Sequence, residues 1–154
     1  MQITELLTRY ECGPQLLRTA VRRAREDQFD LVPVAGQWSI RQLVCHISDF
    51  ELVYADRLKR VLVEDNPTMF SGDPDAFARR LQYGRRSVSE ELELIGLIRQ
   101  QVVRILREIP LEDFQRTGVH SEAGPLTLET LLERVAGHIP HHVRFVDQKI
   151  AAMG

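Results

Sequence analysis

The sequence contains little cysteine, few aromatic residues and no long apolar run, and each shortage excludes a class of protein. Cys12 and Cys45 are its two cysteines, too few for a disulfide scaffold, so we expect reduced thiols and a cytoplasmic location. Aromatic residues make up 6% of the 154 positions, so the core must be mainly aliphatic, which suits helices better than a β-sandwich. No uninterrupted apolar stretch approaches the roughly 18 residues that a transmembrane helix needs. We therefore expect no membrane as a partner.

The sequence also lacks a large excess of either positive or negative charge. The 20 basic and 22 acidic residues leave a net charge of −2, so bulk electrostatics gives no reason to expect nucleic acid as a partner. Arginine pairs such as Arg85-Arg86 lack the interleaved aromatics of a nucleic-acid platform, and we interpret them as solvated faces or dimer salt bridges. At 44% hydrophobic, the chain can bury one core, and its length fits a single domain over residues 1–154.

Apolar residues recur with the spacing of an amphipathic helix in four stretches, at about 3–24, 39–62, 87–109 and 127–150. Ser39 and Thr127 are good N-caps for the second and fourth stretches, and Pro110 ends the third. Gly13-Pro14 predicts a kink or a short break in the first. Four amphipathic helices of similar length predict an all-α four-helix bundle. No stretch alternates with period two for long enough to predict a sheet.

The connection between the second and third helices is long. It covers about twenty residues and holds a short helical piece near 76–81. A connection of this length permits a crossover, so the two helices that it joins need not be antiparallel neighbours.

Two of the predicted helices carry histidines that a core does not need. His138 and His142 are four residues apart, so their side chains lie one turn apart on the apolar face of the fourth helix. His46, on the second helix, neighbours Ile47 and can also point inward. Unpaired burial of an imidazole costs on the order of a few kcal/mol, and a divalent metal would satisfy these rings. Three histidines with an open fourth position are typical of a catalytic metal site rather than a structural one.

Other interpretations of these residues stay open at the level of sequence. An H-x-x-x-H pair alone also fits solvated or otherwise satisfied histidines, and His141 is a rival ligand because it too lies within one turn of His138. Ile139 stands where the zinc-protease motif H-E-x-x-H has its glutamate, which excludes that mechanism. Pro140 predicts either a kink that sets the approach of the two ligands or the start of a separate helix.

Further residues near the predicted site have candidate roles. Asp49, three residues after His46, can share its face and orient an imidazole, hold a metal-bound water or accept a proton. Cys45 points away around the helix, and we interpret it as a buried small hydrophobe. His120 lies on a loop before the fourth helix and is either exposed or part of the mouth of the site. Trp38 can cover the start of the second helix as a hydrophobic lid.

The sequence resembles a known family in motifs spread over almost its whole length. The segment Gly36-Gln37-Trp38-Ser39, followed by His46-Ile47-Ser48-Asp49-Phe50-Glu51, resembles the W-S-x6-H-x-x-D-x-E signature of the DinB/YfiT-like superfamily. The second half of the chain is also similar to sequences of that family. The similar positions are Arg116-Thr117-Gly118-Val119-His120, Gly124, the helix start Thr127-Leu128 and the pair His138-x3-His142. The resemblance spans about residues 3–152.

The resemblance implies a bundle in up-down-down-up order with a long crossover between helices two and three. It implies a metal site formed by His46, His138 and His142, filled by zinc or alternatively nickel, and a homodimer. Members of the family are thiol-dependent S-transferases and isomerases that use low-molecular-weight thiols, or are labelled metal-dependent hydrolases. We therefore expect a metal-dependent enzyme with a small-molecule substrate, with Asp49 as a catalytic residue and His120 near a cofactor. The alternative is a non-catalytic binding or stress-response module that keeps the metal for stability.

Overall fold

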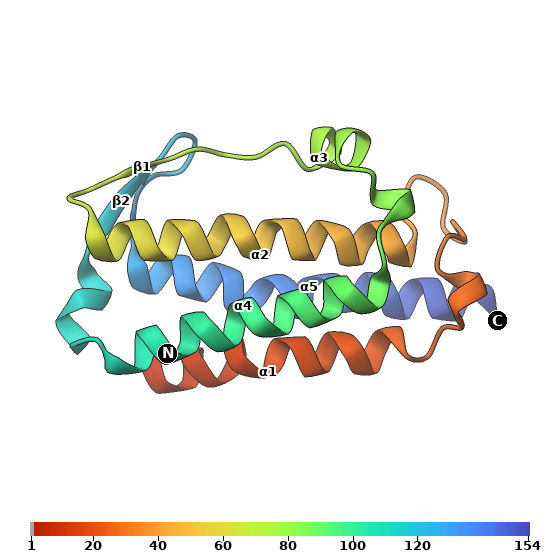
Figure 1. The fold of residues 1–154 in the computed structure, drawn as a ribbon, viewed down its shortest axis with the longest axis horizontal. Coiled ribbons are helices and arrows are strands. Elements are labelled where there is room, and N and C mark those ends of the chain that lie inside the picture. The colour runs from red at the N-terminus through yellow and green to blue at the C-terminus, as the bar shows by residue number, and fades with distance from the viewer. Residues whose placement is uncertain (1) are drawn as a thin grey trace.

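The computed structural model describes residues 2–154, which form four long helices with a short helix and a small sheet on one side (Figure 1). The long helices are α1 (Ile3–Val21), α2 (Ile40–Val63), α4 (Val88–Glu108) and α5 (Leu128–Met153). The short helix α3 (Pro74–Arg80) lies in the connection between α2 and α4, close to the expected 76–81. Short 3-10 helices occur at Glu26–Gln28, Tyr83–Arg85 and Leu111–Gln115.

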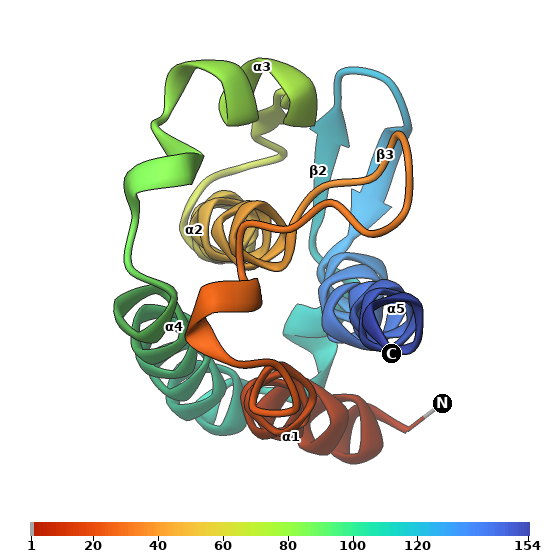
Figure 2. The same ribbon diagram turned by 90° about the vertical axis from the view of Figure 1, so that its right-hand side faces the viewer.

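The order of the helices is up-down-down-up, as predicted. Figure 1 shows α1 and α5 running in one direction and α2 and α4 in the other, with the connection through α3 returning along the outside of α2. In cross-section, α1 and α2 are each neighbours of both α4 and α5 (Figure 2). The long connection is therefore a crossover that makes α2 and α4 parallel neighbours.

Side-chain caps begin three of the four long helices, and two of these caps, Ser39 and Thr127, were predicted. The Ser39 hydroxyl accepts the backbone N–H of Gln42 at 3.2 Å, and the Gln42 side chain accepts the N–H of Ser39 at 2.9 Å, which forms a capping box. Ser87 and Thr127 cap α4 and α5 through their hydroxyls. Pro110 follows the end of α4 by two residues. The caps therefore fix where these helices start, and the positions agree with the sequence analysis.

Neither internal proline breaks its helix. α1 continues through Gly13-Pro14 and α5 through Pro140, so a break in the first helix and a separate helix starting at Pro140 are both wrong. Because Pro14 has no N–H, the carbonyl of Tyr10 lacks its helical partner, and the Arg99 guanidinium of α4 donates to it at 2.7 Å. Gly13 provides the space, since a Cβ there would lie 2.2 Å from Nη1 of Arg99.

A small sheet is present that the sequence pattern did not predict. β1 (Thr68–Met69), β2 (Thr117–His120) and β3 (Gly124–Thr127) lie in the order β1-β2-β3, with β1 parallel and β3 antiparallel to β2. Strands of two and four residues are too short to show a period of two. The sheet attaches the crossover connection to the segment that leads into α5.

The aliphatic core falls into two apolar clusters that occupy opposite halves of the bundle. One contains Leu6 of α1 and Leu58 of α2, and the other contains Leu17 and Leu43 of the same helices. Buried charged residues lie between the two clusters. Within the described residues, no helix is both long enough and apolar enough to cross a membrane.

Candidate metal centre

Three histidines from two neighbouring helices converge on one point. The Nε2 atom of His46 on α2 lies 3.2 Å from Nε2 of His138 and 3.1 Å from Nε2 of His142, both on α5. The latter two Nε2 atoms are 3.1 Å apart. These three histidines form a group that could hold a metal ion, and His141 is not part of it. The structure thus brings together the residues that the sequence singled out.

Local structure and aromatic packing set the positions of the rings. The spacing of four residues stacks His138 and His142 on one face of α5, and α2 brings His46 against that face. The ring centroid of His46 lies 4.9 Å from that of Trp38 and 4.7 Å from that of Phe50. Trp38, just before α2, therefore packs against the ring of His46, and its role as a hydrophobic lid stays a prediction.

Burial lowers the pKa of all three imidazoles. The pKa of His46 falls to about 4, that of His142 to about 3 and that of His138 to about 2, with loss of hydration as the largest cause in each case. Repulsion between the neighbouring rings lowers the pKa of His138 and His142 further. All three rings are therefore neutral at pH 7, which is the form that binds a metal ion.

The spacing of the three Nε2 atoms fits a small divalent ion. Tetrahedral zinc with Zn–N bonds of about 2.0–2.1 Å separates its nitrogen ligands by about 3.3–3.4 Å, close to the observed 3.1–3.2 Å. In the tautomer with hydrogen on Nδ1, the three Nε2 lone pairs face one another, and a cation between them would accept all three. A three-histidine set leaves a further coordination position for a ligand.

Among the described residues, the Nδ1 atoms of two of the three histidines have no hydrogen-bond partner. The Nδ1 atoms of His46 and His138 are buried, and no hydrogen-bond partner for them lies among residues 2–154. Metal-bound histidines usually donate from this nitrogen to a carboxylate or a carbonyl. In this protein, packing against aromatic side chains holds the His46 ring instead.

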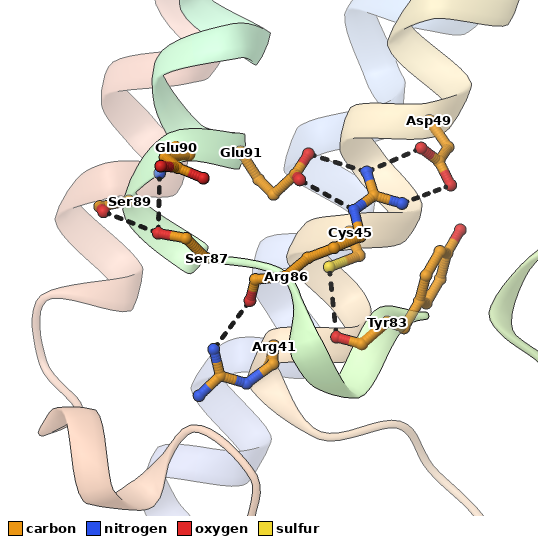
Figure 3. A network of polar contacts seen from close by, with 9 residues as sticks. All are labelled: Arg41, Cys45, Asp49, Tyr83, Arg86, Ser87, Ser89, Glu90 and Glu91. Atoms are coloured by element: carbon orange, nitrogen blue, oxygen red, sulfur yellow. Dashed lines mark hydrogen bonds and ion pairs between the residues drawn. The ribbon is translucent and has the colours of Figure 1, made fainter. Parts of the chain in front are cut away.

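Asp49 lies one turn from His46, but its carboxylate is held by Arg86 (Figure 3). The guanidinium donates to the two oxygens of Asp49 at 3.0 and 2.8 Å, and it also donates twice to Glu91 at 2.8 Å. The interpretation of Arg86 as a solvated or dimer-forming residue is wrong, because it joins α2 to α4 within the chain. The charge of Asp49 still opposes the lowering of the His46 pKa. Its catalytic role stays a prediction.

His120 and Cys45 are not part of the three-histidine cluster. Nδ1 of His120 accepts the backbone N–H groups of Glu122 and Ala123, at 3.2 Å each, and so shapes the turn between β2 and β3. A role for His120 in cofactor binding stays a prediction. Cys45 is buried, its thiol donates to the Tyr83 carbonyl at 3.7 Å, and burial raises its pKa to about 11. Cys45 is the small buried side chain that the sequence predicted.

A cavity of about 310 Å³ opens beside His142. Its wall includes Trp38 before α2 and Phe145 and Lys149 of α5. The sequence analysis missed Lys149, which is 1% exposed and donates from Nζ to Oε1 of Gln37 at 2.9 Å. A signal was available, because a residue seven positions after His142 lies on the same helical face.

Comparison with known proteins gives matches over most of the chain. A model of the DinB superfamily matches residues 9–146. The chain is 27% identical over 144 residues to a protein of Oceanobacillus iheyensis named "Putative metal-dependent hydrolase", covering 94% of this chain and 83% of the relative. A protein of Bacillus cereus with the same name is 28% identical over 133 residues, covering 86% of this chain and 76% of the relative.

Solved structures share the fold. YfiT from Bacillus subtilis, described as having an unusual four-helix bundle topology, matches with a TM-score of 0.92 at 24% identity. The match covers 100% of this chain and 90% of YfiT. A mycothiol-dependent maleylpyruvate isomerase matches with a TM-score of 0.75 at 10% identity, over 94% of this chain and 60% of the isomerase.

Proposed function

Because this chain belongs to the DinB superfamily and brings three neutral histidines together beside a cavity, we propose that it is a metal-dependent enzyme acting on a small molecule. The observation that carries the proposal is the convergence of three Nε2 atoms within 3.2 Å of one another. The names of the relatives support metal dependence.

The protein's own residues would hold the ion and shape its surroundings. His46, His138 and His142 are the ligands that we propose for zinc, with nickel as the alternative. Such an ion would supply a Lewis acid that lowers the pKa of a bound thiol or water. Each ring is neutral at pH 7 and keeps a single N–H, so no second proton competes with the ion for the ligand nitrogen. Trp38 keeps bulk water from one side of His46.

Thiol transfer is the reaction that the surrounding residues favour. The thiolate of a low-molecular-weight thiol would attack an electrophilic carbon of the substrate, and a carbon–sulfur bond would form as the bond from that carbon to a leaving group breaks. The leaving group would depart with the bonding electron pair, and the thiol proton would pass to water in the cavity. The two carboxylates that follow His46 on α2 are engaged: Asp49 pairs with Arg86, and Glu51 pairs with Arg99. A thiol that ionises on a metal ion needs no carboxylate base. The isomerase that shares the fold depends on mycothiol, which supports a thiol as the second substrate.

Hydrolysis is the second candidate. It is favoured by the name of the relatives in Oceanobacillus iheyensis and Bacillus cereus. The same three histidines would serve, with water in place of the thiol.

Metal analysis tests the centre directly. We expect protein purified without a histidine tag to hold close to one divalent ion per chain, and His46→Ala, His138→Ala and His142→Ala each to lose it. His141→Ala is the matched control, because this ring neighbours His142 but lies outside the cluster, and it should keep the ion. Full occupancy in His46→Ala or His142→Ala would contradict the proposal.

Measuring turnover distinguishes an enzyme from a non-catalytic module that keeps the metal for stability. The metal-loaded protein is mixed with a panel of low-molecular-weight thiols and a chlorodinitrobenzene electrophile, and conjugation is followed by absorbance. We expect thiol-dependent conjugation that His142→Ala abolishes. All proteins in this assay carry the Cys12→Ser substitution, because the exposed Cys12 thiol could itself react with the electrophile. Absence of turnover with every thiol and with ester substrates would favour the non-catalytic module.

A further inference from the structure

Lys149 is a buried cation that has no anionic partner among the residues that the structure describes. It is 1% exposed, and its ammonium donates to the neutral amide oxygen of Gln37 at 2.9 Å. None of the ion pairs formed within residues 2–154 includes Lys149. An ammonium has three donors, and the amide oxygen uses one of them.

Such an arrangement is costly unless something else compensates the charge. Burial disfavours the charged form and lowers the pKa of Lys149. The ring of Phe145, whose centroid lies 5.9 Å from Nζ, offers a weak cation–π contact. An apolar side chain of the same length would avoid the desolvation cost altogether. An anion that enters from the cavity would provide the missing partner.

The position of Lys149 connects it to the three-histidine centre. Lys149 follows His142 by seven residues, two turns along the same face of α5, with Cα atoms roughly 10 Å apart at about 1.5 Å per residue. Both residues line the cavity of about 310 Å³, which is in the size range of small-ligand sites. The positive charge of Lys149 is felt at His142, whose pKa it helps to lower.

Among the residues that line the cavity, Lys149 is the buried positively charged one. Asp75, at the start of α3, also lines the cavity but is exposed. His141 lies at the rim, where its Nδ1 is 2.8 Å from a guanidinium nitrogen of Arg144. An anion would therefore bind on the α5 side of the cavity, away from Asp75.

We propose that Lys149 binds the anionic group of a ligand whose other end reaches the three-histidine centre. The ligand class is an elongated small molecule with a carboxylate or phosphate at one end, either the thiol or the molecule that the thiol attacks. This inference rests on the proposed function and specifies the substrate class of the same site.

The test measures binding rather than turnover. The zinc-loaded protein is titrated by calorimetry with mercaptohexanoate, with mercaptohexyl phosphate and with the uncharged mercaptohexanol. We expect the wild type to bind at least one of the two anionic thiols about tenfold more tightly than the alcohol, as a charge-assisted hydrogen bond would give. The tighter of the two anions identifies the group that the site prefers.

Three variants isolate the role of Lys149. Lys149→Met should remove the preference for the anion and leave the affinity for mercaptohexanol unchanged, whereas Lys149→Arg should keep a preference. Arg134→Met is the matched control, because it removes one positive charge from an exposed position of α5 that does not line the cavity. Lys149→Met replaces a buried charge by an apolar chain, so we expect a melting temperature no lower than that of the wild type.

The outcomes separate this inference from the proposed function. A wild type that holds zinc and binds all three thiols equally, or a Lys149→Met protein that keeps the preference, overturns the role of Lys149 only. A wild type that holds no metal overturns the proposed function instead. In that case the metal-free protein is titrated with hexanoate, and binding by the wild type but not by Lys149→Met supports the anion site. Equal binding by both overturns it.

Discussion

Arg99, in α4, contacts each of the other three long helices. Its guanidinium donates to the carbonyls of Tyr10 on α1 and Val135 on α5, and it forms an ion pair with Glu51 on α2. It also stacks over the ring of Tyr10, with its Cζ 4.4 Å from the ring centroid. With 1% exposure, this residue lies between the two apolar clusters and fixes how the helices are aligned.

We expect Arg99→Met to lower the free energy of unfolding by about 3–5 kcal/mol, because it leaves the buried carboxylate of Glu51 unpaired. The double variant Arg99→Met/Glu51→Leu should recover most of the loss, since it removes both charges. Urea unfolding of the metal-free proteins measures both. A double variant no more stable than the single one would mean that the pair itself is strongly net stabilising.

The lowered pKa values of the histidines predict how stability depends on pH. Folded protein keeps His46, His138 and His142 neutral below the ordinary histidine pKa of about 6.5, whereas the unfolded chain takes up protons there. The unfolded state then binds more protons, so the metal-free protein loses stability as the pH falls from about 7 towards 4. Urea unfolding at a series of pH values measures the slope.

His46→Ala should flatten this slope, because one of the three groups no longer titrates. Exposed His141 provides the control, and His141→Ala should leave the slope as it is in the wild type. An equal slope in all three proteins would show that carboxylates, and not the histidine cluster, cause the acid sensitivity.

At the scale of elements, the start of α4 is held to α2 by the Arg86 guanidinium between Asp49 and Glu91. We expect Asp49→Asn and Glu91→Gln each to lower stability by about 1–3 kcal/mol, because each weakens a charge-assisted hydrogen bond. Metal content should not change in either variant. Both oxygens of Asp49 accept from Arg86, so Asp49, like Glu91, is engaged in holding this guanidinium. We therefore expect Asp49→Asn and Glu91→Gln to lose similar amounts of enzymatic activity.

This pair of variants also tests the role that the sequence predicted for Asp49. Glu91→Gln is the matched control, because Glu91 binds the same guanidinium but does not follow His46 on α2. A much larger fall in kcat for Asp49→Asn, with loss of one limb of the pH–rate profile, would show that Asp49 moves a proton.

Elements with local signals were predictable from the sequence, and elements that depend on distant partners were not. Ser39 and Thr127 mark helix starts through hydrogen bonds within one turn, and the spacing of His138 and His142 places both on one face. The pairing of β1 with β2 joins segments about fifty residues apart and leaves no pattern in either. The spacing from His142 places Lys149 on the same helical face, but its contact with Gln37, 112 residues away, left no pattern in the sequence.

At the scale of the whole molecule, two apolar clusters and the contacts of Arg99 join the four long helices. We therefore expect the chelated protein to keep its helical circular dichroism and to melt cooperatively, at a lower temperature that recovers when zinc is added back. Loss of helical signal on chelation would instead support a module in which the metal maintains the fold. The homodimer implied by the family resemblance stays a prediction, and light scattering on the purified protein measures it.

The crossover topology determines when the metal centre can form during synthesis. His46 leaves the ribosome 92 residues before His138 and 96 before His142, because its helix precedes the long connection and α4. A nascent chain that lacks α5 presents one of the three ligands, and a free α5 would present the other two. An ion that needs all three ligands is held only after α5 has been synthesised, so we expect metal loading to be a late step. A chain truncated before α5 would keep His46 alone of the three proposed ligands.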